Sequence, residues 1–201
     1  MAASVDMLLE ALPVEARPLT AELLTEANIT IKITPKRKTK HGDFRIDARG
    51  GACITLNASK NPYQFLITLL HELAHWFTYK KYGRRVKPHG KEWKYSFQHI
   101  ALPFLQPAVF PEPLLSLLAL HLKNPKATSS SDLKLASALR AYDPPKETVT
   151  VLEIAEGDLF SLDNGRVFVR GKKRVKRILC TEVRTQRVYL FSAVAEVYKQ
   201  G

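Results

Sequence analysis

The stretch NPYQFLITLLHELAHWFTYKKY, residues 61–82, carries the strongest structural signal in the chain. Asn61 is a preferred residue at a helix N-cap, and Pro62 suits the first helical turn. Apolar residues then recur at helical spacing between positions 65 and 73, and Gly83 is a natural C-terminal stop. These features predict one long amphipathic helix over residues 61–82.

A His-Glu-x-x-His motif, formed by His71, Glu72 and His75, lies in the middle of this helix. Residues four apart on an α-helix are separated by about 40° around its axis, so both imidazoles project from one face and can bind one metal ion. Glu72 lies beside them, where it can accept a proton from a water molecule at the metal. The alternative is a core helix with two hydrogen-bonded histidines, which would bury three polar side chains without a purpose.

A catalytic zinc usually takes three protein ligands, so a third ligand is needed. His89 follows the end of the predicted helix, in the segment KPHGKEW of residues 87–93. Pro88 and Gly90 flank it and shape the backbone, so its side chain can turn back toward the helix. The weaker candidates are His41, in a polar loop, and His99 and His121, on expected helix surfaces.

The two prolines at 144 and 145 mark the best domain boundary. Before it, we expect further helices at 4–12, 18–27, 91–101 and 114–122, and one that runs from the serines at 129–131 to about Tyr142. We also expect strands at 29–34, 44–46 and 52–57, of which the last two form a hairpin. After it, we expect only strands, at 148–154, 158–162, 166–170, 174–182 and 187–191, with Asn164-Gly165 as a hairpin turn. The sequence therefore predicts an α+β protein with domains at residues 1–145 and 146–201, the second a small, basic, ribbon-like β module.

Composition limits the protein class. The chain has 201 residues, of which 45% are hydrophobic, so a packed core is expected. Its two cysteines, Cys53 and Cys180, are too few for a disulfide framework or a four-cysteine zinc site. Residues 1–18 lack the features of a signal peptide, and no run of 18 apolar residues occurs. We therefore expect a cytoplasmic protein that does not contact a membrane.

The net charge of +12 is unevenly distributed. Residues 166–187 contain nine basic residues and one acidic residue, and so carry two thirds of the net charge. A clustered positive field attracts polyanions, which makes DNA or RNA a candidate partner. The candidate contacts are Arg170, Lys172, Lys173, Arg174, Lys176 and Arg177, with Phe168 and Tyr189 as stacking residues. The alternative is the solvated face of a small sheet.

Taken together, these motifs resemble the SprT-like family of zincin metallopeptidases. The resemblance covers about residues 16–103 and rests on Asn61-Pro-Tyr, His71-Glu72-x-x-His75 and His89-Gly90-Lys-Glu-Trp93. It implies a zincin-like core, a small β-sheet packed on the His-Glu-x-x-His helix and further helices. It also implies that the three histidines bind one zinc ion and that Glu72 is the general base. Many members carry a C-terminal zinc ribbon with four cysteines, whereas this chain has only Cys180 there.

The sequence therefore predicts a zinc-dependent metallopeptidase acting on a polypeptide and recruited to nucleic acid by its C-terminal module. We expect the substrate to align by β-strand addition along the 52–57 strand, taken as an edge strand. The oxyanion-stabilising residue stays open among Tyr79, Tyr82 and Tyr95. One alternative is a non-enzymatic nucleic-acid-binding protein with a structural or vestigial metal site, and another is a hydrolase for a non-peptide substrate. Oligomeric state is not predicted.

Overall fold

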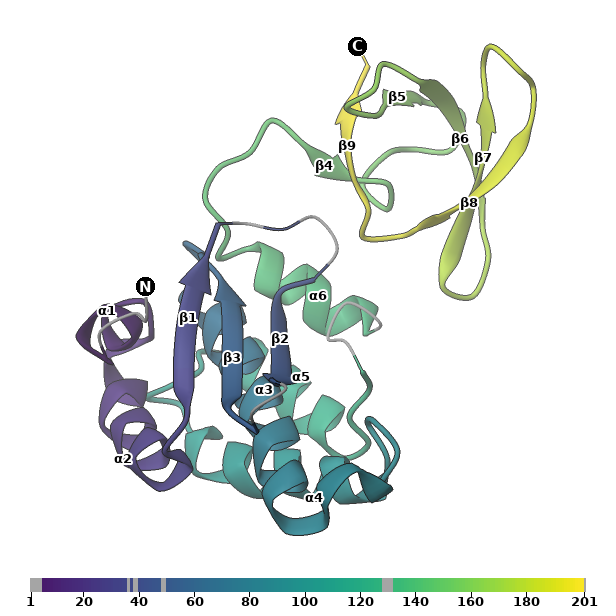
Figure 1. The fold of residues 1–201 in the computed structure, drawn as a ribbon. Coiled ribbons are helices and arrows are strands. Elements are labelled where there is room, and N and C mark those ends of the chain that lie inside the picture. The colour runs from purple at the N-terminus through teal and green to yellow at the C-terminus, as the bar shows by residue number, and fades with distance from the viewer. Residues whose placement is uncertain (1–4, 36, 38–39, 48–49, 128–131, 201) are drawn as a thin grey trace. The chain divides into compact units, whose positions relative to one another are not determined.

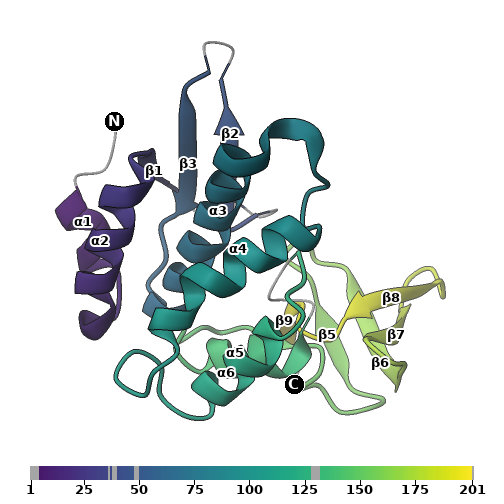
Figure 2. The same cartoon turned by 90° about the horizontal axis from the view of Figure 1, so that it is seen from below.

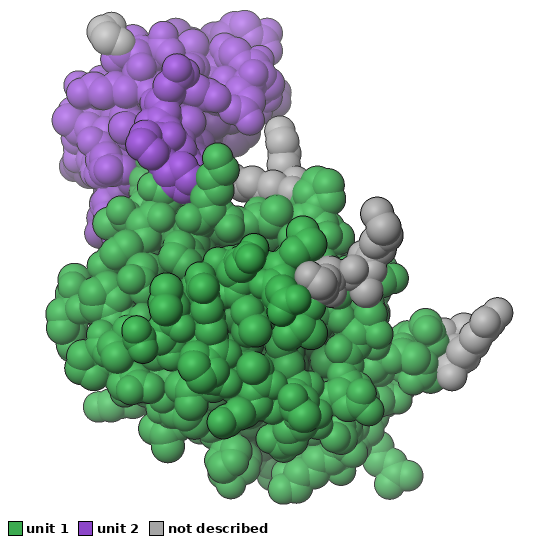
Figure 3. Space-filling model, turned by 90° about the vertical axis from the view of Figure 1, so that its left-hand side faces the viewer, with its two compact units in different colours: residues 1–129, 138–143 green, residues 130–137, 144–201 purple. Residues whose placement is uncertain are grey.

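The computed structural model describes residues 5–35, 37, 40–47, 50–127 and 132–200, which form two compact units (Figure 3). The first unit comprises residues 1–129 and 138–143, and the second comprises residues 130–137 and 144–201. The first combines helices with a small sheet, and the second is built on a separate β-sheet, so the α+β class is confirmed. The predicted assignment of functional domains to residues 1–145 and 146–201 stays a prediction.

The sheet of the first unit has three strands: β1 (Thr30–Thr34), β2 (Gly42–Ile46) and β3 (Ala52–Asn57). β2 and β3 pair antiparallel, which confirms the predicted hairpin, and β1 pairs parallel with β3 on its other side. The strand order is therefore β1-β3-β2.

The expectation that residues 52–57 form an edge strand is wrong, because β3 is the middle strand and is paired on both sides. The hairpin brings β2 to the edge instead. Asn57 donates its N–H to the His41 carbonyl and Asp47 donates its N–H to the Gly51 carbonyl, which fixes the register. In an antiparallel pair these bonds alternate along the strand, so the N–H and C=O groups of residues 42, 44 and 46 point away from β3. Within the described residues, the free edge of the sheet beside the His-Glu-x-x-His helix is therefore that of β2.

Helices cover one face of this sheet. The helices of the first unit are α1 (Val5–Glu10), α2 (Arg17–Ala27), α3 (Pro62–Tyr82), α4 (Lys91–Ala101), α5 (Leu114–Leu122) and α6 (Leu133–Arg140), the last shared with the second unit. α3 lies directly behind the sheet and α4 packs on the far side of α3 (Figures 1 and 2). The serines expected to cap α6 lie outside the described residues. No described helix is both long enough and apolar enough to cross a bilayer.

The start of α3 is fixed by the predicted cap. The Asn61 side chain accepts a hydrogen bond from the N–H of Gln64 at 3.0 Å, which satisfies a backbone donor that the helix leaves unpaired. Its amide Nδ2 also donates to the Leu139 carbonyl and to the Asp143 carboxylate, both at 2.8 Å. One buried side chain therefore both begins the helix and ties it to the end of α6.

The second unit is a six-stranded antiparallel sheet, not a ribbon. Its strands are β4 (Val149–Thr150), β5 (Leu159–Ser161), β6 (Val167–Lys173), β7 (Arg177–Glu182), β8 (Val188–Ser192) and β9 (Glu196–Lys199), in the order β4-β9-β5-β6-β7-β8. The sequence does not predict β9. Only Val197 of this four-residue strand is buried, so no run of alternating apolar residues marks it. The expected strand at 148–154 shrinks to two residues, since the Glu153 carboxylate accepts both the N–H and the hydroxyl of Thr150 and closes a turn.

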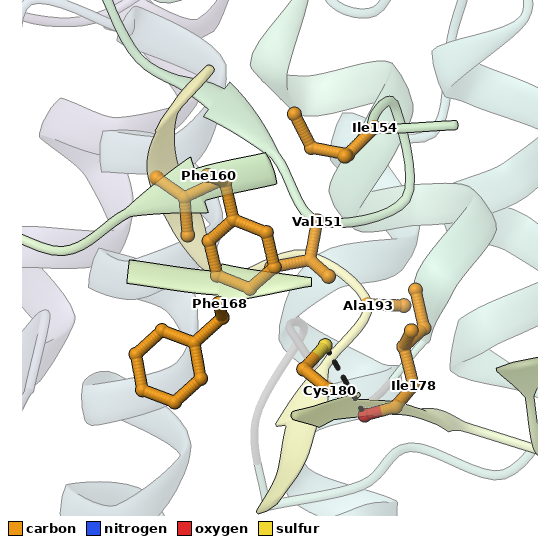
Figure 4. Close-up of a cluster of buried hydrophobic side chains, with 8 residues drawn as sticks. Val151, Ile154, Phe160, Phe168, Ile178, Cys180 and Ala193 are labelled. Atoms are coloured by element: carbon orange, nitrogen blue, oxygen red, sulfur yellow. Dashed lines mark hydrogen bonds between the residues drawn. The ribbon is translucent and has the colours of Figure 1, made fainter. Parts of the chain in front are cut away.

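The inward face of this sheet forms its own hydrophobic core (Figure 4). Phe160 and Phe168 stack there with ring centroids 5.6 Å apart, and the thiol of Cys180 lies beside them. Burial raises the pKa of that thiol, as expected for an interior cysteine that packs as a small apolar residue. Phe168 is therefore inside the unit and is not available as a stacking residue for nucleic acid, contrary to expectation.

Candidate metal centre

Two histidines of α3 point their ring nitrogens at each other. His71 and His75 are four residues apart on the helix, and their Nε2 atoms lie 3.3 Å apart. The first half of α3, which includes Leu66, Leu69 and Leu70, is apolar and is buried against the sheet. The burial that anchors the helix therefore also fixes which face the two imidazoles occupy.

The loop after α3 brings His89 to the same point. Its Nε2 lies 3.0 Å from that of His75 and 3.2 Å from that of His71. His89 has a left-handed backbone conformation, with φ of 57°, which is uncommon outside glycine and concentrates at functional sites. Gly90 closes the turn, because a Cβ at this position would be 2.9 Å from the Lys87 carbonyl oxygen. The loop is therefore shaped to turn the His89 side chain back to α3.

The spacing of the three nitrogens matches a metal site. Zinc–nitrogen bonds of about 2.0–2.1 Å at tetrahedral angles separate the ligand nitrogens by about 3.3 Å. Each neutral imidazole carries one N–H and one acceptor nitrogen, so three converging Nε2 atoms cannot all bond to one another. The group His71, His75 and His89 could hold a metal ion.

Burial keeps these imidazoles neutral, which is the form that binds metal. It lowers the pKa of His71 to about 3 and that of His75 to about 4, and the neighbouring histidines add to both shifts. Burial also lowers the pKa of His89. The site therefore presents three lone pairs at neutral pH.

Trp93 of α4 forms the wall behind the three rings. Its ring centroid lies 4.8 Å from that of His71, 5.4 Å from that of His75 and 4.7 Å from that of His89. Trp93 is itself buried, so it excludes water from that side and limits the rotation of the imidazoles. The tryptophan of the His-Gly-x-x-Trp segment is therefore part of the site, a role that the sequence pattern alone did not assign.

The Glu72 carboxyl group lies between α3 and the edge strand β2. It is buried, and it accepts a hydrogen bond from the outward-pointing N–H of Phe44. Burial raises its pKa from 4.5 to about 7, and the Asp43 carboxylate adds to the rise, while the Phe44 N–H, Arg37 and Lys40 oppose it. A carboxyl group with a pKa near 7 can both take up and release a proton at neutral pH.

Gly42 allows β2 to approach Glu72 this closely. A Cβ at position 42 would lie 2.7 Å from the Oε1 atom of Glu72 and 2.8 Å from the Cγ2 atom of Thr68. Sequence reasoning missed Gly42, because a single glycine after a polar loop gives no sign of what it faces. The only available signal was its position between a polar loop and the strand predicted at 44–46.

The other described histidines, His41, His99 and His121, do not belong to the group that could hold a metal ion. His99 is exposed on α4 and stacks on Tyr95, as expected for a helix surface. His41 is exposed beside β2. His121, in contrast, is buried on α5 and lies close enough to lower the pKa of His71, so its expected place on a helix surface is wrong. An apolar helix such as α5 leaves little room for its histidine to reach solvent.

The tyrosines considered for oxyanion stabilisation contact neighbouring side chains, and Tyr95 is exposed. Tyr79 lies in an aromatic group with Phe44 and Trp76, and Tyr95 stacks on His99. The ring of Tyr82 lies 5.4 Å from the ammonium group of Lys81. None of these contacts assigns an oxyanion role.

The basic residues of the second unit fall into two groups. Arg170 pairs with Glu156 at 3.2 Å, and only 12% of its side chain is exposed. Arg166 pairs with the buried Glu182 at 2.9 Å and lies over the rings of Phe168 and Tyr189, which covers Tyr189. The remaining candidate contacts are all exposed and lie at the hairpin between β6 and β7: Lys172, Lys173, Arg174, Lys176 and Arg177.

Comparison with known proteins agrees with this geometry. Residues 17–109 match the SprT-like family, and this segment contains α3, Glu72 and all three clustered histidines. The chain is also similar to Protein SprT of Vibrio parahaemolyticus serotype O3:K6 (strain RIMD 2210633), with 56% identity over 61 residues that cover 26% of this chain and 36% of that protein. It therefore spans about a third of that relative's length. No solved structure matches the chain significantly. Residues 17–109 of this protein belong to the SprT-like family.

Proposed function

We propose that this protein is a zinc-dependent metallopeptidase of SprT-like type, with a zincin-like core in its first unit. One observation carries the proposal: three neutral histidine nitrogens converge within 3.3 Å, and a buried glutamate lies on the same helix next to the first of them. A structural metal site needs three or four ligands but has no use for a proton acceptor beside them. The presence of Glu72 therefore favours catalysis over a purely structural site.

His71, His75 and His89 would hold the metal through their Nε2 atoms. Zinc, when bound, acidifies a water molecule and polarises the carbonyl group that is attacked. Glu72 would take the proton from that water and later give it to the amine of the leaving peptide. Its pKa of about 7 suits both roles at neutral pH. Trp93 would keep bulk water away from the rings on the α4 side.

The free edge of β2 supports an extended polypeptide as substrate. The outward N–H and C=O groups of residues 42 and 46 and the C=O of Phe44 form a row to which a peptide can add as a further strand. The Phe44 N–H at this edge already contacts the Glu72 carboxylate, so a peptide paired there would pass beside the general base. Main-chain pairing would bind many sequences, and side-chain pockets would then select among them.

Substitution of Glu72 tests the proposal most directly. Glu72→Gln keeps the size of the side chain but removes the proton acceptor, so we expect the variant to bind zinc like the wild type and to lose hydrolysis of an unfolded protein substrate by at least about 100-fold. Glu26→Gln, an exposed change on α2, is the matched control. Metal content and cleavage are measured on the same preparations.

Two results would contradict the proposal. If the zinc-loaded wild type cleaves no unfolded protein, with or without DNA, the protein is not a peptidase. If DNA binding then survives both His71→Ala and Glu72→Gln, the non-enzymatic alternative, a nucleic-acid-binding protein with a structural metal site, gains the support that the peptidase loses.

A further inference from the structure

The hairpin between β6 and β7 has an unusual tip. Arg174 donates its N–H to the Arg177 carbonyl at 2.7 Å, so Val175 and Lys176 form the end of the hairpin. Figure 1 shows the hairpin extending away from the rest of the sheet in the second unit. Its sequence from 172 to 177 is KKRVKR. A hydrophobic residue therefore stands at the tip of a short run that is otherwise entirely basic.

Turn geometry does not explain Val175. β-Branched residues are poor turn residues, and the tight turns of hairpins favour Asn-Gly and similar pairs with positive φ. The neighbouring β5–β6 hairpin contains Asn164-Gly165, and Gly165 takes the positive φ, 78°, that its turn needs. Val175 is 90% exposed, the highest value among the exposed large hydrophobic side chains of the described residues. It makes no contribution to the core, and its side chain is accessible to a partner outside the chain.

The five basic side chains around Val175 are exposed and unpaired. Lys172, Lys173, Arg174, Lys176 and Arg177 form no ion pair with any carboxylate that the structure describes. Arg166 and Arg170, by contrast, lie nearer the middle of the sheet and are both paired with glutamates. The hairpin tip therefore carries five basic side chains that no described carboxylate neutralises, while the exposed Arg184 and Arg187 lie between β7 and β8.

A β-bulge precedes this tip. The β6–β7 register shifts between Arg170 and Lys173, so β6 carries an extra residue there. Gly171 permits the close approach, because a Cβ at this position would lie 2.9 Å from the Leu179 carbonyl oxygen. Bulges increase the local twist and redirect the strands that follow them. The bulge thus sets the direction of the basic tip, which is part of a regular hairpin and not an irregular loop.

We propose that the β6–β7 hairpin is an arm that binds duplex DNA in the minor groove, with Val175 inserted as a wedge between base pairs. Basic side chains on both strands of the arm would contact the phosphates along the groove, and apolar wedges in minor-groove proteins unstack base steps. Residues 172–177 contain no aromatic side chain on which single-stranded bases could stack. The minor groove of A-form RNA is wide and shallow, so it lacks the walls that would hold an arm on both sides.

The wedge is tested with the full chain and a short DNA duplex that contains 2-aminopurine, whose fluorescence rises when its base step unstacks. We expect wild-type protein to raise the fluorescence, and Val175→Ser to abolish the rise and weaken binding about tenfold. Val188→Ser, at a valine that is 62% exposed on β8, is the matched control and should behave like wild type. If Val175→Ser leaves the fluorescence rise intact, the wedge is disproved.

The phosphate contacts are tested by the salt dependence of binding. Replacing Lys172, Lys173 and Lys176 with Gln should lower the slope of log K against log salt by up to about 2.7, since each phosphate contact contributes about 0.9. The control replaces three exposed lysines of the first unit, Lys32, Lys60 and Lys126, with Gln and makes the same change in net charge. Equal weakening by both triple variants would mean that total charge, and not the hairpin, binds DNA.

Competition by other polyanions identifies the partner. Unlabelled duplex DNA should displace the labelled duplex at lower concentration than single-stranded DNA, duplex RNA or vesicles rich in anionic lipid. Stronger competition by any of these three would overturn the assignment to duplex DNA in favour of that competitor. The proposal does not depend on hydrolysis, so it can fail while the metallopeptidase proposal stands, and the reverse also holds.

Discussion

The candidate metal centre and the β6–β7 hairpin present their polar side chains in opposite ways. At the metal centre, three side chains from two segments converge within 3.3 Å under a buried tryptophan. At the hairpin, five basic side chains lie side by side in solvent, with no carboxylate neighbour among the described residues. The first arrangement depends on geometry, so losing one member should disable it. The second depends on the amount of charge, so losing one member should weaken it only slightly.

The largest expected effect is that of removing one histidine. His89→Ala should lower zinc affinity by more than about 100-fold, because loss even of an outer residue that orients a ligand costs about 10- to 100-fold. His99→Ala, at an exposed histidine on α4, should leave the affinity unchanged. Competition with a chromophoric chelator measures both. Full zinc affinity in His89→Ala would remove this histidine from the ligand set and end the contrast between the two regions.

The metal-free protein should lose stability as the pH falls. His71 and His75 have folded pKa values of about 3 and 4, below their usual 6.5, so the unfolded chain takes up two more protons below pH 6.5. Glu72 has the opposite effect between pH 7 and 4.5, because its folded pKa is raised to about 7. For these three groups the net difference is about one proton, which predicts a loss of about 1.4 kcal/mol per pH unit between pH 6.5 and 4.5, and the lowered pKa of His89 adds to the loss.

Urea unfolding of chelator-treated protein across this pH range measures that slope. Glu72→Gln removes the opposing carboxyl group, so its slope should be about twice as steep. A free energy of unfolding that does not change with pH in either protein would mean that the imidazoles are not held neutral by burial.

Gly42→Ala should produce a moderate effect that separates chemistry from metal binding. The added methyl group would meet Glu72 at 2.7 Å, and overpacking of this kind typically costs about 1–3 kcal/mol. We expect lower stability and lower peptidase activity with normal zinc content, since the methyl group meets Glu72 and Thr68 and not the histidines. Lys32→Ala, an exposed change on β1, serves as the control. Unchanged activity would show that the position of Glu72 does not depend on β2.

The smallest expected effect is that of a single hairpin charge. Lys176→Gln should lower the salt slope of DNA binding by about 0.9 and leave zinc content unchanged. Binding titrations at several salt concentrations measure the slope. Complete loss of DNA binding from this one change would mean that the hairpin, like the metal centre, requires a fixed geometry, and the contrast would fail.

The accuracy of the sequence-based expectations follows the range of the interactions involved. α3 and α4 begin and end within a residue of their expected limits, because caps, glycine stops and helical spacing are local signals. β9 and the middle position of β3 were missed, since strand order depends on pairing between distant segments. The buried position of His121 was missed for the same reason: helical spacing does not reveal which other elements cover a helix.

The sequence alone determined that His71 and His75 share one face of a helix, with Glu72 beside them, because four residues along an α-helix make one turn plus about 40°. Only the tertiary structure decided how His89 reaches them, through a left-handed backbone and a wall supplied by Trp93. Only the tertiary structure placed Glu72 against the edge of β2, where burial raises its pKa and Gly42 leaves room. Spacing along a helix is a local property, whereas burial and close approach depend on which distant segments pack together.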